Sequence, residues 1–157
     1  MQSKLIVTTA VGAMALLAAC GGTTSTATAS PSPSPAATGT TIAVATDAKL
    51  GQILVDGKGM TVYLFVADTG TASTCYTSCA QFWPPVLTDG APQAGTGAHA
   101  SLLGTTTRTD GKVEVTYAGH PLYYFLKDKV AGDTTGQGIN GFGALWWVMG
   151  PSGAAMH

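Results

Sequence analysis

A repeated segment constrains the fold of this chain more than any other feature of its sequence. Residues 51–68 and 111–128 align without a gap at a constant offset of sixty residues and share six identities in eighteen columns. The identical positions are Gly51/Gly111, Val55/Val115, Gly59/Gly119, Tyr63/Tyr123, Phe65/Phe125 and Asp68/Asp128. Two copies of one supersecondary unit usually pack together to share a core. The repeat therefore predicts a pseudosymmetric domain made of two like units.

Each copy has the pattern of a β-hairpin. Residues 52–55 and 113–117 read as strands, and the glycines within 56–59 and 118–120 suit tight turns. The return segments are apolar at successive positions, which indicates strands that are covered on both faces. We predict a mainly β fold, in which two hairpin repeats pack into one small sheet-like, sandwich-like or barrel-like domain. The two Tyr-x-Phe pairs are expected to meet near a pseudo-twofold axis.

A loop and a tryptophan-containing segment follow each hairpin. Residues 82–87 and 144–149 are predicted strands, and the first must end early or lie at a sheet edge because Pro84 and Pro85 have no amide donor. The predicted domain spans 42–151, with repeats at about 48–90 and about 105–151, and a disordered tail is expected over 152–157.

The N-terminus predicts export. Lys4 precedes an uncharged run over 5–19, which has the length of a signal-peptide core and falls short of the roughly 20 apolar residues of a membrane-spanning helix. The run ends in Leu17-Ala-Ala-Cys20, which resembles the lipobox of bacterial lipoproteins. That resemblance implies a signal peptide over 1–19 and a lipid on Cys20, and a plain secretory signal is the alternative. Residues 20–41, rich in Ser, Thr and Pro, then form a tether.

Charge and motif content narrow the function classes. The predicted domain carries six Lys or Arg and eight Asp or Glu residues, scattered and mixed in sign. Without a basic stripe, we expect no binding to nucleic acid. The sequence has neither a nucleophile elbow nor a glycine-rich phosphate loop. The membrane, reached through the N-terminal lipid, is the one partner that the sequence indicates, and we expect a monomer.

Cys75 and Cys79 have two interpretations. A lipid on Cys20 leaves them as a pair, and four residues of a helical turn bring their Cα atoms to roughly 6 Å, within disulfide range. A disulfide is the expectation outside the cytoplasm. The alternative is a Cu(I) site that combines both thiolates with His120. Further candidate ligands for copper are Met60, His99 and Met149.

The acidic and aromatic side chains also allow more than one interpretation. Asp68 and Asp128 each follow an aromatic strand, where a carboxylate commonly accepts backbone amides to form a turn. As a pair they could instead act as acid and base or bind calcium. The three tryptophans are expected mainly in the core, with a sugar-binding or peptide-binding face as the alternative.

The order of these motifs resembles a bacterial family known as secreted repeats of unknown function, which are predicted lipoproteins with a conserved Tyr-x-aromatic-x-x-Asp motif. The motif falls on Tyr63, Phe65, Asp68, Tyr123, Phe125 and Asp128, and the likeness covers about residues 50–151. The resemblance implies an exported, envelope-associated domain and no reaction.

Together these features predict a lipid-anchored, extracytoplasmic binding or scaffolding module of the bacterial cell envelope. The alternative is a copper-binding or redox envelope protein that uses Cys75 and Cys79 with His120. A hydrolase that uses Asp68 or Asp128 is the third and weakest hypothesis, so an enzyme is not favoured.

Overall fold

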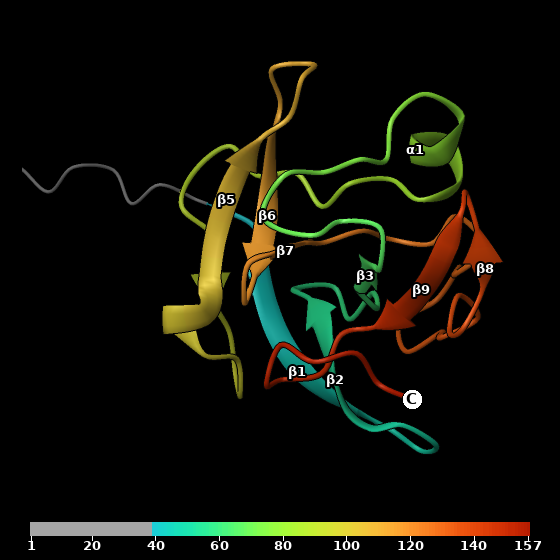
Figure 1. The fold of residues 1–157 in the computed structure, drawn as a ribbon. Helices are drawn as coiled ribbons and strands as arrows, with labels where there is room; N and C mark the ends of the chain where they lie inside the picture. Colours follow the sequence, from blue (N-terminus) through green and yellow to red (C-terminus); the bar gives the residue numbers. More distant parts are fainter. Residues whose placement is uncertain (1–38) are drawn as a thin grey trace, which may run out of the picture. The chain divides into compact units, whose positions relative to one another are not determined.

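The computed structural model describes residues 39–157 (Figure 1). The predicted signal peptide, Cys20 and all of the tether except 39–41 lie outside the described residues. Within the described residues, no helix is long and apolar enough to cross a membrane. The elements are β1 (Thr41–Asp47), β2 (Gly51–Asp56), β3 (Tyr63–Phe65), α1 (Ser78–Phe82), β4 (Gln93–Ala94), the 3-10 helix η1 (Ala100–Leu102), β5 (Leu103–Thr107), β6 (Val113–Tyr117), β7 (His120–Pro121), β8 (Asn140–Gly141) and β9 (Ala144–Val148).

The strands form three small sheets, so the prediction of a mainly β fold is confirmed. The strand orders are β2-β1-β4, β3-β9-β8 and β5-β6-β7. β1 and β2 form an antiparallel hairpin, and β5 and β6 form the equivalent hairpin of the second repeat. β5 was not predicted, because its sequence, Leu-Gly-Thr-Thr-Thr, has a single apolar residue and no alternation.

Tight turns carry the chain from β2 and from β6 into the return segments, as predicted. In the first repeat, Oδ1 of Asp56 accepts hydrogen bonds from the amides of Lys58 and Met60 at 2.8 and 2.9 Å. In the second, Ala118 and Gly119 have φ angles of 50° and 84° and form the two-residue turn that pairs Tyr117 with His120. Such a turn requires positive φ at both central residues.

The two repeats are interlocked, because each return segment pairs with the tryptophan segment of the other repeat. The amide of Val66 donates to the carbonyl of Leu145 at 3.0 Å. The equivalent bond in the other half joins the amide of Leu126 to the carbonyl of Phe82 at 2.8 Å. The pairing of β3 with β9 is visible in Figure 1. Neither repeat therefore satisfies its backbone hydrogen bonds alone.

The pseudo-twofold relation is seen where the return segments meet. The amide of Tyr63 donates to the carbonyl of Tyr123 at 2.8 Å, and the amide of Tyr123 donates back to the carbonyl of Tyr63 at 3.0 Å. The predicted meeting of the two Tyr-x-Phe pairs is confirmed.

Alternate residues of the return segments pack into different apolar clusters. Tyr63 and Phe65 belong to one cluster, whereas Val62 and Leu64 belong to the other. The first return segment is thus covered on both faces, as its unbroken apolar sequence predicted.

Two local predictions are wrong. Residues 82–87 form no regular strand: α1 ends at Phe82, and only isolated bridges follow at Pro85 and Leu87, because the two prolines cannot donate to a ladder. Residues 152–157 are not a disordered tail. Ala155 pairs with Met149, and the amide of Met156 donates to the carbonyl of Val148 at 2.9 Å.

Candidate functional site

The tyrosines and aspartates of the motif form two hydrogen bonds that cross between the repeats. The hydroxyl of Tyr63 donates to Oδ2 of Asp128 at 2.6 Å, and the hydroxyl of Tyr123 donates to Oδ2 of Asp68 at 2.6 Å. All four side chains are buried. Burial raises the pKa of both phenols well above the usual value, and the neighbouring carboxylates add to the shift, so both tyrosines remain donors.

The second oxygen of each carboxylate holds a loop. Oδ1 of Asp68 accepts from the amide and the hydroxyl of Thr74 at 2.7 and 2.6 Å. Oδ1 of Asp128 accepts from the amide and the hydroxyl of Thr135 at 3.0 and 2.6 Å. Each aspartate therefore ties the loop after its own return segment to the tyrosine of the opposite repeat. This geometry is that of a structural clamp, and the interpretation of the aspartates as turn-forming residues is the one it supports.

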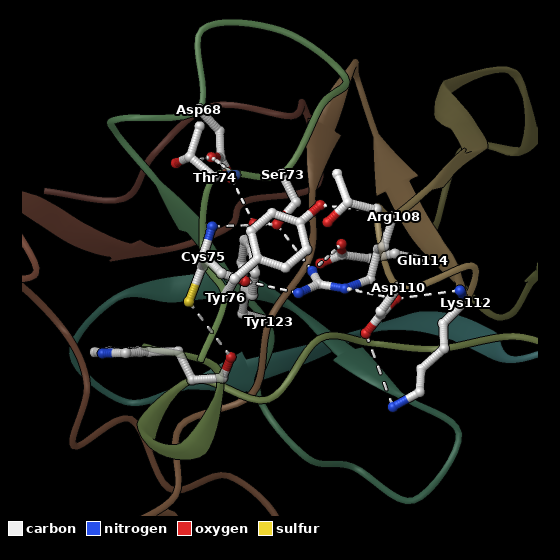
Figure 2. A network of polar contacts seen from close by, with 12 residues as sticks. Asp68, Ser73, Thr74, Cys75, Tyr76, Arg108, Asp110, Lys112, Glu114 and Tyr123 are labelled. Carbon is white, nitrogen blue, oxygen red and sulfur yellow. Dashed lines mark hydrogen bonds and ion pairs between the residues drawn. The ribbon is translucent and has the colours of Figure 1, made fainter. Parts of the chain in front are cut away.

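A buried polar network surrounds Tyr123, and residues 39–157 form no equivalent network at Tyr63. Figure 2 shows the guanidinium of Arg108 among several acceptors. Its Nη1 donates to Oε2 of Glu114 at 2.6 Å and to Oγ of Ser73 at 2.8 Å, and its Nη2 donates to the carbonyl of Cys75 at 2.6 Å. The ring of Tyr76 lies 4.4 Å from the guanidinium carbon, within cation–π range.

Arg108 and Glu114 are the single arginine and the single glutamate of the chain. Glu114 is fully buried and stands sixty residues after Leu54, so an ion pair in the second repeat replaces an apolar contact in the first. Burial raises the pKa of Glu114 to about 7, although the Arg108 guanidinium opposes the shift. Sequence reasoning missed this pair, and the charge at a position equivalent to leucine was the available signal.

Four aromatic rings form a column through the core. Phe65 stacks on Trp146 with ring centroids 4.0 Å apart, Trp146 on Trp83 at 4.0 Å, and Trp83 on Phe125 at 4.3 Å. Each phenylalanine stacks on the tryptophan of the other repeat. The side chains thus follow the backbone, in which each return segment pairs with the tryptophan segment of the other repeat. Trp83 and Trp146 are fully buried, as the core interpretation expected.

One end of this column borders a surface hollow of about 230 Å³. Phe82 and Phe142 are 45% and 46% exposed, and their ring centroids lie 5.9 Å apart. The residues that line the hollow are Phe82, Trp83, Phe125, Lys127, Ile139, Gly141 and Phe142. They come from the end of α1, the β8–β9 hairpin and the segment that follows the second return strand, and α1 lies near that hairpin in Figure 1. Lys127 is the one charged residue in this lining.

The family described as "Secreted repeat of unknown function" matches the chain twice, at residues 44–87 and 104–149. The chain belongs to this family. The two matches cover more than half of the sequence and each contains one copy of the Tyr-x-Phe-x-x-Asp motif. No curated protein and no solved structure is significantly similar to the chain. Membership in a family of secreted repeats indicates an extracytoplasmic module whose activity is unknown.

In this secreted repeat protein, Cys75 and Cys79 form the predicted disulfide, with their Cα atoms 5.2 Å apart. Both residues are buried, and Cys79 lies in α1. A disulfide sulfur is not the thiolate that binds Cu(I).

The further candidate copper ligands of the secreted repeat protein are dispersed among its turns and strands. His120 begins β7, and its buried Nδ1 has no hydrogen-bond partner within the described residues. Met60 occupies the corresponding turn of the first repeat. Among residues 39–157, no group of three or more His, Cys, Asp or Glu side chains is arranged to hold a metal ion.

Proposed function

We propose that this protein is a lipid-anchored, noncatalytic binding module of the bacterial cell envelope, and that the aromatic hollow is its binding surface. One observation carries the proposal: Phe82 and Phe142 remain nearly half exposed beside a stacked aromatic floor formed by Trp83 and Phe125. Concave sites with aromatic walls and few polar groups are typical of small-ligand binding.

The frame around the hollow supports binding without rearrangement. The carbonyl of Phe82 is held by the amide of Leu126, and the β8–β9 hairpin is held by the pairing of β9 with β3. Binding to a preformed hollow avoids most of the free-energy cost of ordering side chains and loops. The interlocked repeats thus supply a rigid support for exposed aromatic groups.

The sequence Leu17-Ala-Ala-Cys20 supports lipid anchoring, and the disulfide supports an oxidising compartment. Expression of the full chain in a bacterial host tests the anchor. We expect the protein to partition into the detergent phase with an acylated Cys20, and Cys20→Ser to move it to the aqueous phase. Unchanged partition of the Cys20→Ser variant would rule out this anchor.

The binding proposal is tested by NMR on the exported chain that carries Cys20→Ser. Fractions of bacterial envelope are added, and the amide shifts of Phe82, Gly141 and Phe142 are followed, with the exposed Val130 as the control outside the lining. We expect at least one fraction to shift the lining amides selectively. If no fraction does so, the hollow is not a binding surface.

The copper or redox alternative needs Cys75 and Cys79 as thiolates. Thiol titration of the native protein, followed by copper titration of the wild type and of His120→Ala, separates it from the binding module. Two free thiols in the domain and a copper affinity that falls in His120→Ala would favour the alternative.

A further inference from the structure

Phe142 occupies a backbone conformation that a bulky side chain disfavours. Phe142 and Gly143 have φ angles of 58° and 94° and form the two-residue turn between β8 and β9, where Gly141 pairs with Ala144. A turn of this kind needs positive φ at both central residues, and Asn, Asp or Gly is strongly preferred at the first. A phenylalanine at this position makes the turn less stable than those residues would.

Packing does not compensate for this strain. Phe142 is 46% exposed, and its ring contacts that of Phe82, a residue that is itself 45% exposed. Strained residues that gain little burial cluster at binding sites, where the surrounding fold maintains them. Ala118 has a similar φ angle in the turn before β7, so the strain at Phe142 supports a ligand site only in combination with the hollow that Phe142 lines.

The lining specifies the class of ligand. The hollow, at about 230 Å³, lies below the usual 300–1,000 Å³ of drug-sized pockets, so it suits a group of one or two fused rings. The rings of Phe82 and Phe142 are inclined at 43° and present aromatic surface to that space. A planar aromatic group can stack on such surfaces or meet them edge-on.

Charge specifies the remaining part of the ligand. Exposed phenylalanine faces alone would attract a cation, but Lys127 is part of the lining and its positive charge repels one. Within residues 39–157, Lys127 forms no ion pair with the protein. A carboxylate or similar anionic group on the ligand would provide the missing partner.

We propose that the hollow binds a small planar aromatic anion, with its ring packed against the rings of Phe82 and Phe142 and its negative group at Lys127. This inference rests on the proposed binding function of the hollow and names the chemical class of its ligand.

The probe that tests the inference is 2-naphthoate, with the neutral 2-naphthamide as its matched control. The exported chain with Cys20→Ser is titrated by calorimetry. Because this variant lacks the lipid, no detergent is needed that could occupy the hollow. We expect one site with a Kd on the order of 0.1 mM for the naphthoate, as for an efficient ligand of this size. The naphthamide should bind about fivefold more weakly, since an exposed ion pair is worth little more than that.

Two lysine variants isolate the charge. Lys127→Gln should reduce the affinity for naphthoate to that for naphthamide and leave the affinity for naphthamide unchanged. Lys129→Gln is the matched control, because Lys129 is exposed and its Nζ donates to the carbonyl of Leu126 at 2.7 Å. It should change neither affinity. Equal binding of the two probes by the wild type would overturn the anionic requirement.

The Phe142→Asn variant tests whether the strained backbone at Phe142 is maintained for ligand binding. Asparagine tolerates the left-handed conformation, so the variant should unfold at a higher urea concentration and bind naphthoate about tenfold more weakly. Phe82→Ala, at the other wall, should weaken binding to a similar extent. An affinity that is unchanged in Phe142→Asn would overturn the proposed site, and a lower stability would overturn the strain argument.

The outcomes for ligand class and for binding function are distinct. If naphthoate does not bind saturably while envelope fractions still shift the amides of the lining, the aromatic-anion assignment is wrong and the binding module stands. If neither naphthoate nor any fraction acts on the hollow, both proposals fail.

Discussion

The hydroxyl of Tyr63 lies 2.6 Å from a carboxylate oxygen of Asp128, which belongs to the other repeat, and Tyr123 makes the equivalent contact with Asp68. The family motif therefore does not act within one repeat. It joins two repeats at buried positions, where each carboxylate also holds a loop through a threonine. In this protein, the motif attaches one half of the domain to the other.

Removal of one motif hydroxyl should destabilise the fold. Tyr63→Phe leaves Oδ2 of Asp128 buried without its donor, and such a loss costs about 1–3 kcal/mol. Urea unfolding measures the change in the free energy of unfolding. Tyr124→Phe is the control, because its bond to Asp56 is longer, at 3.0 Å, and only partly buried. A smaller loss in Tyr63→Phe than in Tyr124→Phe would contradict the clamp.

Neither repeat should fold alone. The return segment of each half pairs with the tryptophan segment of the other, as in the bond from Val66 to Leu145, and each phenylalanine stacks on the tryptophan of the opposite repeat. Fragments 39–98 and 99–157 should each lack a cooperative unfolding transition. Mixed together, they should form a one-to-one complex that unfolds cooperatively, as measured by tryptophan fluorescence. Cooperative unfolding of either fragment alone would contradict the interlocked arrangement.

The constant offset of the repeat was sufficient to predict that Tyr63 and Tyr123 meet, because equivalent strands of a two-copy domain pack at its axis. It could not predict that each tyrosine donates its hydrogen bond to the aspartate of the other repeat. The spacing from Tyr63 to Asp68 is the same whether the bond forms within a repeat or between repeats, and only the packed structure distinguishes the two.

The burial of Glu114 could not be predicted from the sequence, for a different reason. In the strand predicted over 113–117, Val113, Val115 and Tyr117 alternate with Glu114 and Thr116, a pattern typical of a strand whose polar face is exposed. Its burial depends on Arg108, which reaches it from the turn before β6, and on Leu87, which bridges to it from the first repeat. Such a tertiary contact overrides the alternation of a single strand. The hollow could not be predicted from the sequence either, since its lining comes from three separate segments.

Removal of the disulfide should weaken the protein without unfolding it. Cys75 and Cys79 are four residues apart, and a loop this short restricts the unfolded chain by only about 2 kcal/mol. The Cys75→Ala, Cys79→Ala double variant should keep the near-ultraviolet circular dichroism of the wild type and unfold at a lower urea concentration. A loss of the native spectrum would show that the bridge determines the fold.

Stability should fall as the pH rises from 4.5 to 7, because of Glu114. Its pKa is about 7 in the folded protein and about 4.5 in the unfolded chain, so the folded state binds the extra proton between these values. The free energy of unfolding should therefore decrease from pH 4.5 to 7, by up to about 3 kcal/mol, and level off above. Glu114→Gln should remove this decrease. Urea unfolding across the range checks it, and equal pH profiles for variant and wild type would refute it.

Loss of Arg108 should lower the free energy of unfolding more at high pH than at low pH. At pH 8, Arg108→Met leaves the ionised carboxylate of Glu114 buried without its cation, and breaking a buried pair in this way costs about 3–5 kcal/mol. At pH 5, Glu114 takes up a proton and the charge disappears, so the remaining cost is that of the lost hydrogen bonds to Ser73 and to the carbonyl of Cys75. Urea unfolding of Arg108→Met and of the wild type at the two pH values measures the difference. An equal loss at both values would mean that Glu114 is neutral in the folded protein throughout this range.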